Sequence, residues 1–175
     1  MPPAQTAFIP YHFTARDGSL FIFAKKIAPQ IPPQQIKDVN KIYKRDLNVR
    51  VRNARYTNEY NCHGLTFAAK LGWFDDVRRM LGCHSYIKVG SVINYDVDHF
   101  NPNTDVTRGD IVVYYDGNQA NVTHTGIVWS KRTSKGKLYV TVLSKWGGYS
   151  EYFHRHDKVP IGYGKSVEVW TDRKI

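Results

Sequence analysis

Cysteine is scarce in this chain, and long apolar runs are missing. The 175 residues include two cysteines, Cys62 and Cys83, which excludes the disulfide framework of small secreted domains. No stretch approaches the roughly 20 apolar residues that a membrane-spanning helix needs. The opening residues, "MPPAQTAFIPYHF", lack the basic region and apolar core of a cleavable signal peptide. We therefore expect a soluble protein without a membrane span, cytoplasmic or exported by a leaderless route.

Acidic residues are outnumbered by basic ones, 15 to 25, which leaves a formal net charge of +10. Such a surface attracts anionic polymers, including nucleic acid and acidic cell-wall material. The basic residues are scattered, however, and form no dense block of the kind found in nucleic-acid-binding tails. Because 42% of the residues are hydrophobic and 14% aromatic, the chain is expected to bury a real core. Contact with an anionic polymer is one interpretation of the charge, and a solvated surface is the other.

The first 50 residues differ in composition from the rest. They are rich in proline and contain one strand-like island at 19–24, preceded by the turn signal Asp17-Gly18. Apolar residues at helical spacing then predict a short amphipathic helix over 33–47. We expect residues 1–50 to form an N-terminal extension with a short strand and a helix, and residues 51–175 to form the main domain.

The main domain is expected to begin with helices and to continue with strands. Helices are predicted at 62–71, capped by Asn58 or Asn61 and ended by Gly72, and at 73–81. Strands are predicted in five segments: 109–117, 124–130, 138–148, "YSEYFHR" and "SVEVW". This order predicts an α+β fold in which N-terminal helices pack on an antiparallel sheet of about five to six strands.

Cys62, in "YNCHGLTFAA", stands where a polar loop turns into the first predicted helix of the main domain. Unpaired backbone N–H groups and the positive end of the helix dipole stabilise a thiolate there, and the thiolate is the nucleophilic form of cysteine. A free cysteine is also among the most frequently buried residues, so core packing is the other interpretation.

A cysteine nucleophile needs a base, and His124 is the histidine best placed to provide one. It begins the predicted strand "HTGIV", and Gly126 on the same strand allows another backbone or a substrate to approach closely. A hydrogen-bonded histidine at the rim of the sheet is the alternative interpretation.

A metal site is the alternative use of these residues, because Cys62-His63 and Cys83-His84 are zinc-ligand types. Adjacent side chains on a helix point about 100° apart and rarely bind one ion together. We therefore expect no metal and no cofactor, and we expect His63 to point away from Cys62. His154 and His156 are expected on a solvated strand.

The ordered set of "NCHG", "GDIVVYY", "HTGIV" and "VLSKWGG" resembles the papain-like NlpC/P60 and CHAP superfamily of cysteine peptidases and amidases. The resemblance covers about residues 56–165. It implies a papain-like catalytic domain with Cys62 as nucleophile and His124 as base. The chain departs from the pattern at Arg108, where a proline often stands, and at His63-Gly64 after the nucleophile.

The resemblance also implies further site residues. Ser144 lies near the matching place for a third residue that orients the imidazole, and Glu151 or His154 on the next strand is the alternative. Backbone N–H groups at the helix start would form an oxyanion hole, with Asn61 or Tyr60 as an added donor. Asn61 is equally suited to capping the helix. Trp146 lies beside the expected cleft, where it would stack on substrate.

The implied activity is cleavage of amide or peptide bonds through a Cys62–His124 pair, with peptidoglycan stem peptides as the substrate class. Such a protein is expected to be a peptidoglycan amidase or endopeptidase, or a delivered effector toxin with an immunity or delivery protein as partner. Two alternatives stay open. One is a papain-like deamidase or acyltransferase, and the other is a non-catalytic basic module that binds nucleic acid or protein.

Overall fold

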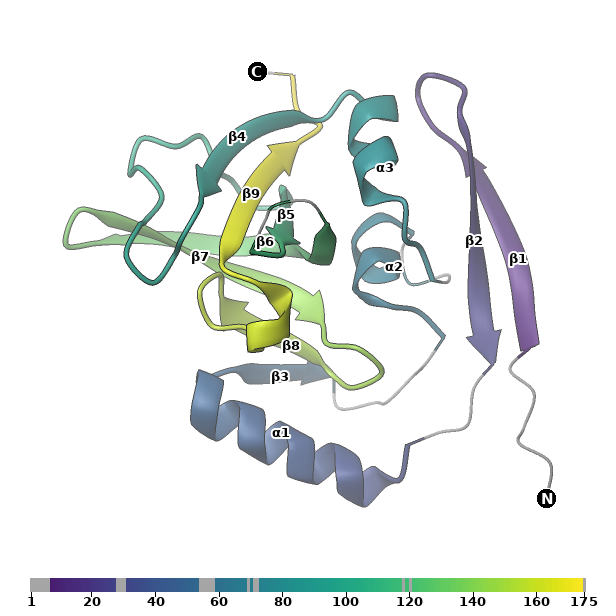
Figure 1. Cartoon of the computed structure of the whole chain (residues 1–175), viewed down its shortest axis with the longest axis horizontal. Coiled ribbons are helices and arrows are strands. Elements are labelled where there is room, and N and C mark those ends of the chain that lie inside the picture. The colour runs from purple at the N-terminus through teal and green to yellow at the C-terminus, as the bar shows by residue number, and fades with distance from the viewer. Residues whose placement is uncertain are drawn as a thin grey trace.

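The computed structural model describes residues 7–27, 31–53, 59–68, 70, 73–117, 119 and 121–174 (Figure 1). Within these residues the helices are α1 (Pro33–Leu47), α2 (Cys62–Phe67), α3 (Val77–Cys83) and the 3₁₀ turn η1 (Ile161–Tyr163). The strands are β1 (Ala7–Thr14), β2 (Leu20–Ile27), β3 (Arg50–Asn53), β4 (Ile87–Val92), β5 (Ile111–Tyr115), β6 (Val122–Ser134), β7 (Lys137–Lys145), β8 (Glu151–Arg155) and β9 (Ser166–Thr171). The fold is α+β, as predicted.

Seven of the strands form one sheet in the order β3-β8-β7-β6-β5-β9-β4, and every described pair in it is antiparallel. Helix α1 lies along one side of the sheet, whereas α2 and α3 lie between the sheet and the β1–β2 hairpin (Figure 1). Side chains alternate between the two faces of a strand. Thus Val112 and Tyr114 of β5 join the core cluster that α1 contacts, and Val113 and Tyr115 join the cluster that includes α3.

Helix α1 has the bounds that the sequence predicts. Pro33 occupies its first turn, and Asn48 ends it in the left-handed conformation with φ 51°. Its Tyr43 ring packs edge-on against Trp146 at 4.8 Å between centroids, and its buried Asn40 accepts a hydrogen bond from the hydroxyl of Tyr152. The helix assigned from sequence to the N-terminal extension is therefore packed on the large sheet.

The predicted N-terminal strand is one arm of a hairpin, in which β1 and β2 pair from Ala7 with Ile27 to Thr14 with Leu20. The turn between them is closed by a 2.8 Å bond from the backbone N–H of Ala15 to the carbonyl of Ser19. Phe21 of β2 is buried against Phe74 near α3, at 5.7 Å between ring centroids.

The sheet is wider than predicted, because β3 and β4 were not expected. Both are short: "RVRN" contains one apolar residue, and Gly90-Ser91 interrupts the apolar alternation in "IKVGSV". Helix α2 ends at Phe67, four residues before its predicted end, and α3 begins at Val77 instead of Trp73. Gly72, the predicted end of the first helix, lies outside the described residues, as does Asn58.

Two histidines at the end of β8 are buried instead of exposed. His154 and His156 are 2% and 0% exposed, so the solvated strand expected for them is wrong; both rings pack among aromatic side chains. No helix in the described part of the chain is both long and apolar enough to cross a membrane.

Candidate active site

Cys62 is the first residue of α2, as predicted, and Asn61 caps that helix. The side-chain Oδ1 of Asn61 accepts a 2.7 Å hydrogen bond from the backbone N–H of Gly64. The same oxygen accepts from the backbone N–H of Phe74 at 3.2 Å, which fixes the loop before α3 against the start of α2. Cys62 is buried, at 9% exposed, on the sheet face that α2 covers.

His63 lies beside Cys62, which corrects the expectation that it points away. Its Nδ1 is 3.7 Å from Sγ of Cys62 and 2.8 Å from Oγ1 of Thr125 on β6. The two Cβ atoms leave the helix about 100° apart. The imidazole nevertheless turns back toward Cys62, because the hydrogen bond with Thr125 holds Nδ1 over the strand that α2 packs on.

The hydrogen atoms in this cluster can be assigned by counting donors. The hydroxyl of Thr66 donates to the carbonyl oxygen of Cys62 at 2.9 Å, so the hydroxyl of Thr125 must donate to Thr66 at 3.1 Å. Thr125 then accepts from His63, whose Nδ1 carries the ring hydrogen in this arrangement. The resting cluster is a chain of hydrogen bonds that runs from His63 through both threonines to the backbone of Cys62.

Burial keeps both members of the pair neutral. It raises the pKa of the Cys62 thiol to about 11, although backbone N–H groups of Thr125 and His63 oppose that rise. It also lowers the pKa of His63 to about 4. At pH 7 the site holds a thiol beside a neutral imidazole.

His124 is not brought to Cys62. It pairs with Tyr114 across β5 and β6, whereas its neighbour Thr125 pairs with Val113, so the two side chains face opposite sides of the sheet. The His124 ring stacks on Tyr163 of η1 at 4.0 Å and an interplanar angle of 6°. Within the described residues, neither ring nitrogen has a hydrogen-bond partner. Burial lowers the pKa of His124 well below its usual value.

Ser144 does not orient His124. Its Oγ lies 2.7 Å from Nε2 of His154 and accepts a 2.9 Å bond from Nε1 of Trp146. The alternative third residue His154 is therefore bonded to Ser144 on the face away from Cys62. Trp146 is 1% exposed and packed under α1, so the structure does not present its ring to a substrate.

Glu151 does not contact a histidine in any bond that the structure shows. Its buried carboxylate accepts from the hydroxyl of Tyr60 and lies 2.6 Å from Nζ of Lys70 and 3.4 Å from the guanidinium of Arg52. These bonds hold the pKa of Glu151 below its usual value against the opposing effect of burial. They tie the loop before α2 to the start of β8.

Neither predicted side-chain donor is available for an oxyanion. The Tyr60 hydroxyl is used by Glu151. Both hydrogens of the Asn61 amide are used as well, by the carbonyl of Phe74 at 2.9 Å and by Oδ1 of Asp75 at 3.1 Å. The structure therefore gives Asn61 the capping role.

Two residues near the thiol were missed by sequence reasoning, Thr125 and Lys145. Lys145 is 1% exposed; its Nζ donates to the carbonyl of Tyr149 at 2.7 Å and lies 5.0 Å from the ring centroid of Tyr60. Burial lowers the pKa of Lys145 to about 8. The signal that could have identified Lys145 is a lone lysine inside the apolar strand "VLSKWGG".

No group of three or more histidine, cysteine or carboxylate side chains in the described residues is placed to hold a metal ion. Cys83 is half-buried, and its Sγ lies 3.4 Å from Oγ of Ser19.

Comparison with known proteins found no match: no family model, no curated protein and no solved structure is similar to the chain.

Proposed function

We propose that the protein is a papain-like cysteine hydrolase that cleaves amide bonds, with Cys62 as nucleophile and His63 as its base. The observation that carries the proposal is the contact of 3.7 Å between Sγ of Cys62 and Nδ1 of His63 at the first turn of α2. A thiol and an imidazole in this arrangement are the minimum set for nucleophilic catalysis by cysteine. Among the residues that the structure describes, the base predicted from sequence, His124, has no hydrogen-bond partner.

The proton path requires the other tautomer of His63 from the resting one, because Nδ1 needs a lone pair to accept a proton. Reaction begins from the tautomer with hydrogen on Nε2 of His63, so that the Nδ1 lone pair takes the proton of Cys62. The new Nδ1–H then donates to Thr125 Oγ1, 2.8 Å away, which stabilises the imidazolium. Thr125 is therefore a positioning residue in this proposal.

The chemical steps then balance. The thiolate attacks the amide carbon, and Nδ1–H gives its proton to the leaving nitrogen as the C–N bond breaks. Water attacks the thioester, its proton passes to Nδ1, and the C–S bond breaks as the thiolate regains a proton. Backbone N–H groups of His63 and Thr125, which favour the thiolate of Cys62, are the available donors for negative charge.

The substrate class comes from the resemblance to NlpC/P60 and CHAP proteins, and peptidoglycan stem peptides are our first proposal. The order of the elements supports this proposal, because a helix that begins with Cys62 is followed by the antiparallel strands β5, β6 and β7. A deamidase or acyltransferase would use the same pair. An effector role, with an immunity or delivery protein as partner, is part of the same proposal.

The experiment that tests the proposal is covalent trapping. An N-acyl amino acid chloromethyl ketone should alkylate Cys62 in the folded protein, as read by peptide mass spectrometry, and Cys83→Ala should label at the wild-type rate. His63→Ala should label at least about tenfold more slowly, since general-base catalysis contributes at least that much. His124→Ala is the matched variant, and it should label like the wild type.

Two results would contradict the proposal. If His124→Ala abolishes labelling while His63→Ala does not, the base is His124 and the site rearranges to use it. If Cys62 stays unlabelled in the folded protein, Cys62 is a buried core residue and the chain is a non-catalytic binding module. Release of new amino groups from purified peptidoglycan, compared with Cys62→Ala, tests the substrate class separately.

A further inference from the structure

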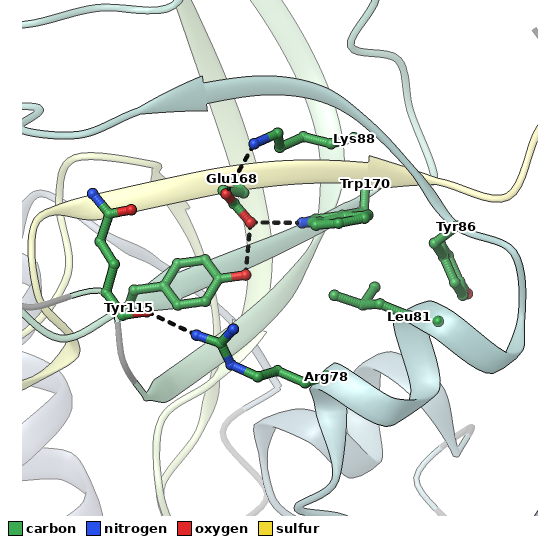
Figure 2. Close-up of a pocket in the computed structure, with 9 residues that line it drawn as sticks. Arg78, Leu81, Tyr86, Lys88, Tyr115, Glu168 and Trp170 are labelled. Carbon is green, nitrogen blue, oxygen red and sulfur yellow. Dashed lines mark hydrogen bonds and ion pairs between the residues drawn. The ribbon is translucent and has the colours of Figure 1, made fainter.

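A cavity of about 470 Å³ lies between α3, the sheet and the segment before β4 (Figure 2). Arg78 and Leu81 reach it from α3, Tyr115 from β5, Trp170 from β9 and Tyr86 from just before β4. Its volume is within the range of about 300–1,000 Å³ that is typical of small-molecule sites. Cys62, His63 and Thr125 do not line it, so it is separate from the proposed hydrolase site.

The carboxylate of Glu168 holds two of the aromatic side chains that line the cavity. Oε2 of Glu168 accepts from the hydroxyl of Tyr115 at 2.7 Å and from Nε1 of Trp170 at 3.0 Å. Its other oxygen accepts from Nζ of Lys88 at 3.3 Å, so the charge of Glu168 is already balanced. The two rings are held in place before any ligand arrives, which reduces the entropy cost of binding.

The charges that line the cavity favour an anion. Among the lining residues that the structure describes, Glu168 has the one carboxylate, against the cations of Arg78 and Lys88. The guanidinium of Arg78 lies 5.3 Å from the ring centroid of Tyr115 and donates to the carbonyl of Gln119 at 2.7 Å. A cationic ligand would find that ring face occupied by Arg78 and the carboxylate neutralised by Lys88. The overall charge of +10 adds attraction for an anion.

The two ends of the cavity differ in chemistry. Figure 2 shows Trp170, Tyr86 and Leu81 toward one end, and Arg78 with Tyr115 toward the other. The first end offers apolar and aromatic surface, which suits a planar ring. The second offers a guanidinium, whose flat set of N–H donors matches the geometry of a carboxylate or phosphate.

We propose that this cavity binds a small aromatic anion, with its ring against Trp170, Tyr86 and Leu81 and its anionic group on Arg78. Carboxylate and phosphate share the recognition chemistry, so the class is an aromatic ring bearing one such group. The site is independent of the proposed hydrolase activity and stands if Cys62 proves to be unreactive.

The test is a titration of the full chain followed by the indole N–H signals of its tryptophans in NMR spectra. Benzoate and phenyl phosphate are the anionic probes, and benzamide and benzylamine are the neutral and cationic probes of matched size. The better anion should bind with a Kd on the order of 1 mM, as expected for a ligand of about ten heavy atoms. The two other probes should bind at least about tenfold more weakly, because they lose the ionic hydrogen bond to Arg78.

Arg78→Gln should weaken binding of the better anion at least about tenfold. Arg79→Gln is the matched control, because the Arg79 guanidinium lies over Phe21, 4.6 Å from its ring centroid and outside the cavity. Arg78→Lys keeps the charge and should retain part of the affinity, which guards against a folding defect in the glutamine variant. A preference for benzoate or for phenyl phosphate decides between carboxylate and phosphate ligands.

Three outcomes would overturn the proposal. In the first, benzylamine or benzamide binds as tightly as both anions. In the second, Arg78→Gln binds the anions as tightly as the wild type does. In the third, neither anion shifts any tryptophan signal at concentrations up to about 20 mM, well above the expected Kd.

Discussion

Nδ1 of His63 lies closer to the hydroxyl of Thr125, at 2.8 Å, than to the sulfur of its sequence neighbour Cys62, at 3.7 Å. The hydroxyl therefore determines how the imidazole faces the thiol. Thr125 on β6 therefore controls the orientation of the His63 ring on α2. The proposed pair depends on a tertiary contact, although its two members are adjacent in sequence.

Replacing Thr125 tests that relationship. Thr125→Val keeps the shape of the side chain and removes the oxygen that accepts from the protonated ring. Labelling of Cys62 by the chloromethyl ketone should slow about tenfold, since a hydrogen bond to a charged group contributes roughly 1.5–3 kcal/mol. Thr125→Ser restores the oxygen and should label within about twofold of the wild type. Equal rates for the valine and serine variants would remove Thr125 from the mechanism.

The start of the helix that carries Cys62 was predictable, but its end and the partner of the thiol were not. Asn61 before an apolar segment is a local capping signal, and the structure confirms the helix start at Cys62. The face on which a strand residue lies depends instead on pairing register. The β5–β6 pairing shifts between Tyr114 and Tyr115, and such irregularities leave no clear trace in a single sequence. The sequence therefore located His124 on the strand without showing which face it occupies.

The same contrast applies to the rest of the fold. The helix over 33–47 has regular apolar spacing and a proline at its start, so its bounds were predicted from local signals alone. Strands β3 and β4 exist because they pair with β8 and β9, which lie more than 70 residues away in sequence. Pairing of this kind overrides weak local preference and has to be observed.

Burial of the Cys62 thiol predicts a loss of stability in alkaline solution. Its folded pKa, about 11, is above the value of 9.0 expected for an exposed thiol, so the unfolded chain loses the proton first. The stabilising contribution is therefore complete below pH 9 and declines as pH rises toward 11, by about 1.4 kcal/mol per pH unit. Urea unfolding of wild type and Cys62→Ala between pH 8 and about 10.5 isolates this effect. A difference in unfolding free energy that is independent of pH would show that the thiol is not held in its neutral form.

Gly126 is predicted to be the least replaceable of the described glycines in β6 and η1. A Cβ atom there would lie 2.5 Å from Cγ1 of Val142 and 2.9 Å from the carbonyl oxygen of Leu143, so the β7 backbone leaves no room. Gly126→Ala should reduce the free energy of unfolding by about 1–3 kcal/mol, as expected for overpacking. Gly162→Ala is the matched control, because a Cβ atom at Gly162 meets nothing within 4 Å. Equal stability of the two variants would contradict the close approach of β6 and β7.

Buried histidines predict that the protein unfolds in mild acid. Burial lowers the pKa of His63, His154 and His156 to about 4, and it also lowers the pKa of His124 well below its usual value. A histidine with a depressed pKa contributes stability above its unfolded value of 6.5, and that contribution is lost as pH falls toward the folded pKa. Each loses about 1.4 kcal/mol per pH unit in this window, so four together remove about 5–6 kcal/mol per unit. Since domains are stable by about 5–15 kcal/mol, we expect unfolding between pH 6 and about pH 4.

His124→Phe separates one histidine from the group. Phenylalanine keeps the stacking on Tyr163 and removes two ring nitrogens that have no hydrogen-bond partner among the described residues, so stability at pH 7 should not fall. The acid dependence of the unfolding free energy should decrease by about a quarter, and the acid midpoint should move to lower pH. An acid midpoint that is the same in His124→Phe and wild type would mean that His124 takes up its proton in the folded protein. That result would contradict the complete burial of the ring.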